Sequence, residues 1–268
     1  MAIETRIPAE ELNIKNFSVE QERPAGTFDT ATEVTQEDWR AMQSFSQSSG
    51  SVDHMLSLKI LDPNIKFQLT DSWRRGLEAM LKQKSTTDFG SYENVGFLAC
   101  LRVLKISADQ EIIKKAVAAG VRSIKRSKNQ ALRSANKFWN FAYEAGSLKL
   151  FKPDAELGID KRVIEGMKME LEEKRTSNLE EYVEFAARIK LLSVPIDCQP
   201  DQKTWKKMKR KLGEYRDADD WFNFIKLARS LKILAAQEIK IGDEGLELVM
   251  PERDQGIAAS KIPESKKF

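Results

Sequence analysis

From residue 107 to residue 234 the chain repeats one pattern, in which a helix-capping residue is followed by apolar side chains three or four positions apart. Asp160, for example, precedes Val163, Met167 and Leu171. This spacing places apolar side chains on one face of a helix, where they can be buried together. Glycine and proline, which interrupt helices, number only 13 and 8 in 268 residues. We therefore expect a mainly α fold with a multi-helix globular body.

Capping signals predict where several of these helices begin. Thr35 with Asp38, and Ser177 with Glu180, have the spacing of a capping box. Asp217 precedes the apolar positions of the last predicted helix. Helices are expected over about 35–45, 73–81, 95–104, 107–124, 132–146, 160–171, 177–189, 203–215 and 217–234.

Two segments change to an alternating pattern typical of β-strands. Residues 55–69 have apolar side chains at alternate positions on both sides of an Asp-Pro-Asn turn, and residues 238–249 show this alternation around a Gly-Asp-Glu-Gly turn. Because successive side chains of a strand point to opposite faces, we predict a short β-hairpin in each segment.

Charge and composition divide the chain into four predicted segments. Residues 1–34 lack sustained periodicity and are predicted to be a flexible acidic arm, since residues 1–55 carry a net charge of −6 and the rest carries +9. Residues 35–150 and 151–250 are predicted to form two helical lobes, and residues 251–268 a flexible tail.

The two predicted lobes share a short similarity. Residues 138–150 align with residues 221–233 without gaps, and six of the thirteen positions are identical. Each copy follows a basic segment. Either the lobes are weakly related, or two helices of similar composition match by chance.

Positive charge is concentrated in two segments, although the whole protein carries only +3. The 32 residues between Glu111 and Glu144 contain no acidic side chain, and a second basic cluster occupies 203–211. Concentrated positive charge is typical of proteins that bind a polyanion. The predicted nucleic-acid-binding residues are Lys114, Lys115, Arg122, Lys125, Arg126, Lys128, Arg133, Lys137, Lys203, Lys206, Lys207, Arg210 and Lys211.

The spacing within the first basic segment argues for a ligand. On a helix, Arg122, Lys125 and Arg126 are neighbours at i, i+3 and i+4, where like charges repel. An anion between them would remove this repulsion. We therefore predict non-enzymatic binding of nucleic acid, either RNA or DNA with RNA favoured, through the phosphate backbone. One concrete form is a nucleocapsid-like protein that coats nucleic acid and self-associates through its N-terminal arm.

Other interpretations remain open. The basic segments could be solvated faces balanced by acidic helices such as 170–184, in a helical adaptor or structural assembly protein with an acidic protein partner. The acidic arm could instead mask the basic surface of its own chain. A helix over 217–234 followed by a hairpin also has the element order of a winged-helix DNA-binding regulator.

No catalytic, cofactor or metal motif is recognised, and we expect no enzyme and no cofactor. His54 is predicted to be a surface residue. Cys100 and Cys198 are predicted to be buried free thiols in a reducing compartment. Four aromatic residues could stack on bases, but their helical spacing favours core positions: Trp139, Tyr143, Trp221 and Phe222.

Localisation is predicted from the same features. No apolar run approaches the roughly 20 residues that cross a bilayer, and the first residues lack the basic start and apolar stretch of a secretory signal. We expect no membrane partner and an intracellular location, in the cytoplasm. Nuclear import is the alternative, since residues 206–211 read Lys-Lys-Met-Lys-Arg-Lys.

Overall fold

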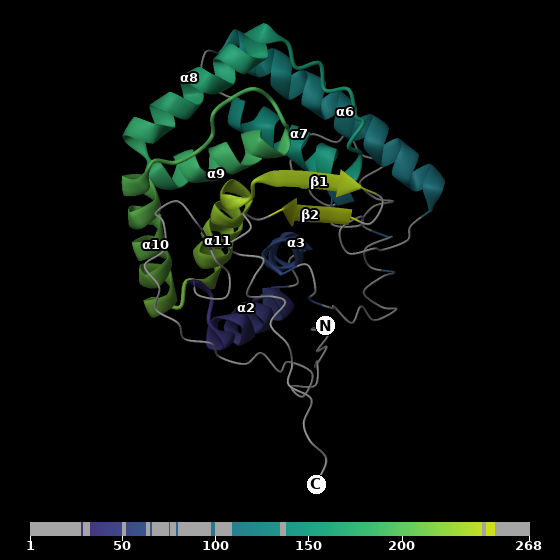
Figure 1. Ribbon diagram of the computed structural model, residues 1–268. Coiled ribbons are helices and arrows are strands. Elements are labelled where there is room, and N and C mark those ends of the chain that lie inside the picture. Colours follow the sequence, from purple (N-terminus) through teal and green to yellow (C-terminus); the bar gives the residue numbers. More distant parts are fainter. Residues whose placement is uncertain are drawn as a thin grey trace.

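The computed structural model describes a mainly helical protein (Figure 1), which confirms the expected fold class. The described residues are 28, 33–49, 52–62, 65, 75, 79, 98–99, 109–134, 138–242 and 245–249. Within them lie α2 (Gln36–Ser49), α3 (Val52–Leu61), α6 (Gln110–Arg133), α7 (Phe138–Phe151), α8 (Lys161–Ser177), α9 (Leu179–Leu191), α10 (Gln202–Asp217), α11 (Trp221–Ala235), β1 (Glu238–Gly242) and β2 (Gly245–Val249).

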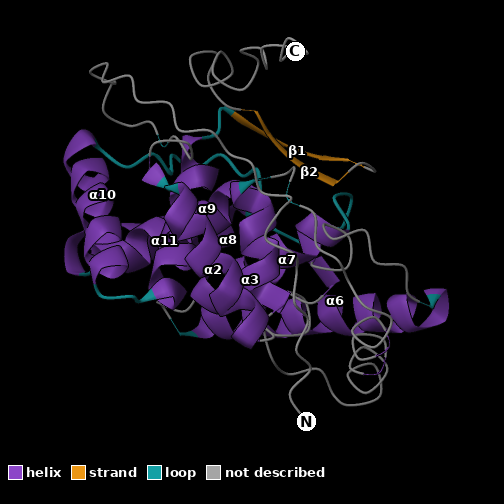
Figure 2. Cartoon of the chain, turned by 90° about the horizontal axis from the view of Figure 1, so that it is seen from below, coloured by secondary structure: helices purple, strands orange, loops and turns teal. Residues whose placement is uncertain are grey.

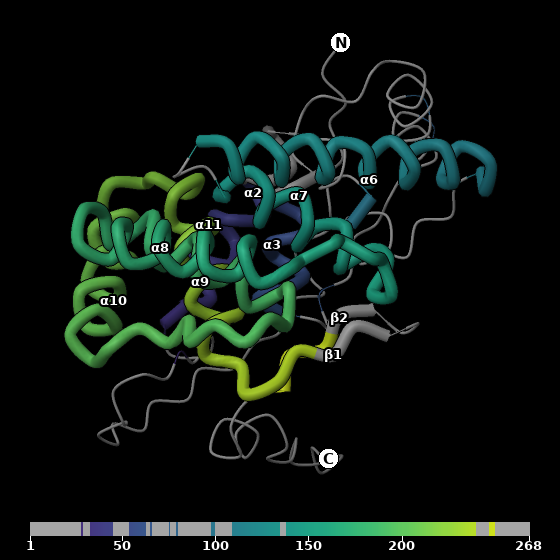
Figure 3. Tube along the Cα trace, turned by 90° about the horizontal axis from the view of Figure 1, so that it is seen from above, coloured from purple at the N-terminus to yellow at the C-terminus, as the bar shows by residue number. Residues whose placement is uncertain are grey.

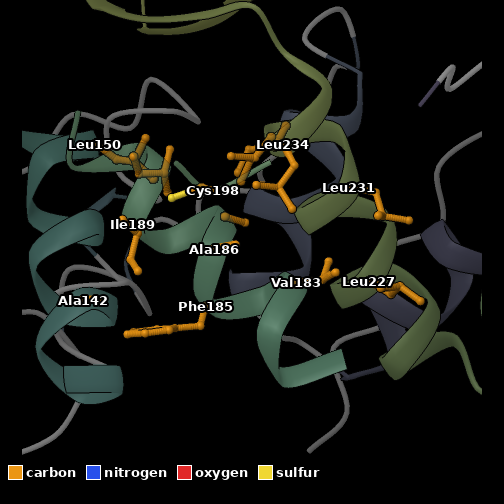
Figure 4. Packing of buried hydrophobic residues seen from close by; sticks show 14 of the residues in the cluster. Ala142, Leu150, Val183, Phe185, Ala186, Ile189, Cys198, Leu227, Leu231 and Leu234 are labelled. Atoms are coloured by element: carbon orange, nitrogen blue, oxygen red, sulfur yellow. The ribbon is translucent and has the colours of Figure 1, made fainter. Parts of the chain in front are cut away.

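Helix α9 lies at the centre of the body, with α7 and α8 packed on one side and α10 and α11 on the other. Figure 4 shows Phe185 and Ile189 on the side of α9 that faces α7, and Val183 on the side that faces α11. All three side chains are fully buried. Because nearly all of its apolar surface is covered, α9 connects the packing of the whole body.

The two segments of the internal similarity form α7 and α11, which both pack on α9. Three of the identical positions are fully buried in both helices: Phe141 and Phe224, Ala145 and Ala228, and Leu148 and Leu231. The identical residues therefore include the positions that fill the core. This burial accounts for the similarity through packing alone, and a true repeat stays a prediction.

Short side chains cap the helices. The Thr35–Asp38 capping box is confirmed, since the Thr35 N–H donates to Asp38 Oδ2 at 2.7 Å and the Asp38 N–H to Thr35 Oγ1 at 3.2 Å. The cap at Asp160 is also confirmed by the hydrogen bond from the Val163 N–H at 3.0 Å. Each cap gives a partner to an N–H that the helix leaves unpaired.

Two predicted caps are wrong by a few residues. Asn178, rather than Ser177, caps α9, and Asp220, rather than Asp217, caps α11. Ser177 still belongs to α8, where its hydroxyl donates to the Glu173 carbonyl at 2.9 Å. The sequence spacing between Ser177 and Glu180 fits a capping box, but it could not show that α8 and α9 are joined by the single residue Asn178.

The predicted hairpin over 55–69 is wrong, because residues 52–61 form the helix α3. Residues 63–64 and 66–69 of the predicted hairpin lie outside the described residues. Alternating Leu56, Leu58 and Ile60 are buried, but the intervening Ser57 is buried as well. Helix α3 is covered by α2 on one side and α11 on another. A helix buried all round has no polar face, so its sequence can imitate the alternation of a strand.

The predicted hairpin over 238–249 is confirmed. Strands β1 and β2 pair antiparallel, with Ile239 opposite Leu248 and Gly242 opposite Gly245. Figure 2 shows both strands at one edge of the helical body. Ile239 and Leu248 are half-buried against the core, which holds the hairpin to the helices.

The predicted segments are not divided by a visible break in the core. Buried residues from 28 to 234 belong to one hydrophobic cluster. Within the predicted arm, Phe28 and Val34 are buried in that cluster, and the rest of residues 1–34 lies almost wholly outside the described residues, as does the tail over 251–268. The division into two lobes stays a prediction. No helix in the described part is both long and apolar enough to cross a bilayer.

Candidate nucleic-acid interface

Helix α6 presents the first basic segment along one edge of the molecule (Figure 3). Its 24 residues span roughly 36 Å at 1.5 Å per residue. Its buried side consists mainly of small residues, including Ala116, Ala119 and Gly120, and it packs against α7 and α8. Small side chains allow close approach, so the long charged side chains of α6 are left to face solvent.

The predicted site residues of α6 fall into two groups. Lys114 pairs with Glu111 at 2.8 Å, and Lys128 donates to the Gly158 carbonyl at 3.0 Å. The charge of Arg126 acts on buried Glu144. By contrast, an exposed set has no ion-pair partner among the described residues; we call Lys115, Arg122, Lys125 and Arg133 the α6 cations. Lys137 lies outside the described residues.

An open hollow of about 470 Å³ lies beside the last two turns of α6. The described residues that line it are polar: Arg126, Asn129, Gln130, Arg133 and Ser134. Guanidinium and amide groups supply hydrogen-bond donors, and the amides also supply acceptors. The side chains that line the hollow can therefore form hydrogen bonds with phosphate oxygens and with the polar edges of bases.

Helix α10 presents the second basic segment. Trp205, Met208 and Leu212 are buried, which confirms the predicted inner face. On the outer face, three exposed lysines have no ion-pair partner among the described residues; we call Lys203, Lys206 and Lys207 the α10 lysines.

The remaining cations of α10 are compensated by acids of the same chain. Lys209 pairs with Glu33 at 2.6 Å, Arg210 with Glu214 at 3.4 Å, and Lys211 with Glu214 at 3.2 Å and with Glu180 at 3.8 Å. The pair with Glu33 shows that the last part of the predicted acidic arm (residues 1–34) contacts the basic helix α10. These contacts favour the interpretation of a balanced surface for this end of α10.

The structure does not bring the two basic helices together. Figures 1 and 3 place α6 and α10 along different edges, with α7, α8 and α9 between them. A short ligand that is bound to the cations of α6 therefore cannot also contact the cations of α10.

Two exposed cations that the sequence analysis missed lie near α6. Lys161 and Arg162 open α8, only three and four residues after Gly158, which accepts the hydrogen bond from Lys128. The first turn of α8 has no acidic residue. A helix N-terminus disfavours cations through its dipole, so this Lys-Arg pair was a signal that could have been noticed.

Three of the four aromatic candidates are half-buried. Trp139 stacks on Phe185 with ring centroids 5.7 Å apart, and Trp221 packs edge-on against Phe224 at 5.4 Å. Phe222 is the exception, with 48% of its surface exposed. Stacking on bases by α7 is therefore disfavoured by its packing.

The lone histidine is buried, so its predicted surface position is wrong. His54 is 5% exposed, and its ring lies edge-on to Phe222 with centroids 5.6 Å apart. It is buried because α3 is a covered helix rather than an edge hairpin. Cys198 is buried as predicted, and burial raises the pKa of its thiol to about 12. Such a thiol is unreactive at neutral pH. Cys100 lies outside the described residues.

Helix α11 is not placed to read a DNA groove. It contacts α2, α3, α9 and α10, and most of its residues are buried. This burial argues against the winged-helix interpretation, although the hairpin follows the helix in the expected order. Across the described ranges, no three His, Cys, Asp or Glu side chains gather in a way that could hold a metal ion.

Comparison with known protein families, with curated proteins and with solved structures finds no match for this chain. Function must therefore be argued from the side chains themselves.

Proposed function

We propose that this protein binds single-stranded RNA through its phosphate backbone and that α6 provides the main contact. The observation that carries the proposal is the set of exposed α6 cations, with which no described carboxylate pairs. Lys115 and Arg122 are seven residues apart, or about 10 Å along the helix. A flexible anionic chain can follow such a row, because phosphate contacts need positive charge but no fixed sequence.

The hollow at the end of α6 favours RNA as a single strand. Arg126 and Arg133 suit phosphate, whereas Asn129 and Gln130 suit the polar edges of bases. Those edges are accessible in an unpaired strand and largely hidden in an A-form duplex. Lys161 and Arg162 add two exposed cations at the start of α8.

The α10 lysines provide a second, weaker contact for a strand long enough to pass around α8. A protein with two such contacts would coat RNA, and residues preceding Phe28 would join neighbouring copies. This role belongs inside the cell and uses phosphate contacts rather than a cofactor.

Fluorescence anisotropy with labelled single-stranded RNA and duplex DNA, over a series of salt concentrations, tests the proposal. The test variant is Lys115→Gln, Arg122→Gln and Lys125→Gln together. The control, Lys209→Gln, Arg210→Gln and Lys211→Gln, removes the same charge from side chains that already have acidic partners.

We expect wild type to bind RNA more tightly than duplex DNA. A plot of log affinity against log salt concentration should be less steep in the α6 variant. Its slope should be smaller in magnitude by about 2, since each single-strand phosphate contact contributes about 0.7 and three cations are removed. The control variant should change less. Equal losses in both variants would contradict the assignment of α6. An absence of binding by folded wild type would favour the adaptor interpretation.

A further inference from the structure

The hollow beside the last two turns of α6 is lined by two amide side chains that the fold does not use. Asn129 and Gln130 are exposed, and neither side chain forms a hydrogen bond within the described residues. Other amides of the chain have structural partners: the Asn178 side chain caps α9, and Gln199 donates to the Leu234 carbonyl near the end of α11. The two amides of the hollow are therefore available to a ligand.

The end of α6 is capped without these amides. The Ser134 N–H donates to the Gln130 carbonyl at 3.0 Å, and the Ser134 hydroxyl donates to the same carbonyl at 2.9 Å. Both bonds satisfy a carbonyl that the helix would otherwise leave unpaired. The cap fixes the last turn of α6, on which the side chains of the hollow are carried, and it leaves the Gln130 side-chain amide unused.

Helical spacing places Arg133 next to both amides. Arg133 follows Asn129 by four residues and Gln130 by three, so their Cβ atoms are roughly 5–6 Å apart on one helix face. Arg133 is exposed, and its guanidinium offers a planar set of donors beside amide oxygens that accept. Arg126 also lines the hollow, but its charge acts on Glu144, and no ligand contact is assigned to it.

Donors beside acceptors match guanine better than the other bases. Guanine has two acceptors, O6 and N7, on one edge and two donors, N1–H and the 2-amino group, next to O6, and a guanidinium on O6 and N7 is the commonest specific base contact. Adenine has an amino group in place of O6, which would meet the donors of the guanidinium, and pyrimidines lack N7. The hollow of about 470 Å³ lies within the roughly 300–1,000 Å³ of small-ligand sites, so one base with its ribose fits.

We propose that the hollow binds one guanine base of an unpaired RNA strand, with Arg133 donating to O6 and N7 and the amide oxygens of Asn129 and Gln130 accepting from N1–H and the 2-amino group. This inference rests on the proposed function, because the α6 cations hold the strand beside the hollow. It adds a base preference to phosphate contacts that carry none. A guanine bound at the end of α6 also fixes the position of the strand along the row of cations.

Fluorescence anisotropy with labelled oligouridylates that differ only in one central base (guanine, adenine or uracil) tests the proposal. We expect the guanine strand to bind roughly tenfold more tightly than the other two. Equal affinity for the three strands, or a preference for adenine, would overturn the guanine site and leave the phosphate contacts of α6 standing. If folded wild type binds no strand, the proposed function fails, and calorimetry with guanosine and adenosine monophosphate decides the hollow. Tighter binding of the guanine nucleotide would then assign the site to a free nucleotide, and binding of neither would overturn it.

Two variants locate the preference in the hollow. Arg133→Lys keeps the charge but replaces the planar fork of donors, so the preference for guanine should be lost while the salt dependence stays unchanged. Asn129→Ala with Gln130→Ala removes the acceptors and should reduce the preference as well. The control Arg210→Lys makes the same change at an exposed arginine of α10 that pairs with Glu214, and it should retain the preference. A preference for guanine that survives in both hollow variants would overturn the assignment.

Discussion

Gly166 of α8 lies so close to the first residue of α7 that no side chain fits between them. A Cβ atom at this position would lie 2.1 Å from Cε2 and 2.3 Å from Cζ of Phe138, whose ring is buried. We therefore expect Gly166→Ala to lower the free energy of unfolding by about 1–3 kcal/mol, measured by urea denaturation.

A matched glycine separates packing from helix propensity. Gly213 also lies within a helix, but a Cβ there would meet nothing within 4 Å. Gly213→Ala should therefore stabilise the protein by about 0.5–1 kcal/mol. If both variants were stabilised, the close contact of Gly166 with Phe138 would be wrong.

Glu144 gives the stability a pH dependence of defined sign. It is 3% exposed and accepts a hydrogen bond from Ser127 Oγ at 3.0 Å. Burial raises its pKa above the ordinary value of 4.5, although the hydrogen bonds and Arg126 oppose the rise. Between 4.5 and the raised pKa the folded protein binds more protons than the unfolded chain. The free energy of unfolding contributed by this group therefore falls as pH rises through that interval.

The variant Glu144→Gln keeps an acceptor for Ser127 but does not titrate. Its stability relative to wild type should increase as the pH is raised from 4 to 7, measured by urea denaturation at each pH. Glu111→Gln, at an exposed position, is the control and should show no such trend of comparable size. A difference that does not vary with pH would show that burial does not perturb Glu144.

At this scale the sequence could predict which site residues face solvent but not which are paired. The apolar spacing of Trp205, Met208 and Leu212 correctly placed the α10 lysines outside. It could not show that Lys209 meets Glu33, because those residues are far apart in the chain and meet only through the tertiary fold. Pairing depends on long-range packing, whereas helical exposure depends on local periodicity.

Among the elements, α11 ends against a side chain from α9. Lys190 Nζ donates to the Leu234 carbonyl at 2.8 Å and also to the Ala236 carbonyl, and Gln199 Nε2 donates to Leu234 at 3.0 Å. These bonds satisfy carbonyls that the helix leaves unpaired. They also fix the point from which β1 departs.

Replacing Lys190 by Met keeps most of the stem but removes both charge-assisted hydrogen bonds. We expect the free energy of unfolding to fall by about 2–3 kcal/mol, and amide hydrogen exchange to quicken around the end of α11 and in β1. Lys203→Met, at an exposed position of α10, should change neither quantity appreciably. Unchanged exchange in the Lys190 variant would show that the hairpin holds α11 without this cap.

Elements with one polar face were predictable, and the fully covered element was not. The amphipathic pattern of α10 agrees with its structure, since its buried residues are those of the apolar stripe. In α3 the polar Ser57 is buried as well, where Arg229 Nη1 donates to its hydroxyl at 3.0 Å. Only the presence of α11 makes that polar position acceptable inside the core, and α11 is distant in the sequence.

For the whole molecule, the helical class followed from local pattern, while the central position of α9 did not. The predicted boundary between the two lobes lies at residue 150, and α9 packs both on α7, which precedes it, and on α11, which follows it. Periodicity identifies the apolar face of a helix, but it does not show which other element packs against that face. The same limit applies to the acidic segment, whose partner on α10 became visible only in the fold.

Two truncations of the predicted acidic arm (residues 1–34) should give different results. Phe28 and Val34 are buried in the common core, and Arg216 of α10 pairs with Asp38 at 2.6 Å and donates to the Glu33 carbonyl at 2.8 Å. Deleting residues 1–34 removes both apolar side chains, so it should cost about 4 kcal/mol or more of unfolding free energy.

Deleting residues 1–24 keeps these contacts, and under the arm hypothesis it should leave stability unchanged while reducing oligomer formation. Urea denaturation and multi-angle light scattering of the two truncated proteins measure these effects. Unaltered oligomers after the shorter deletion would contradict docking of the arm on a neighbouring copy, because that protein retains its core and lacks only the segment proposed to reach its neighbour.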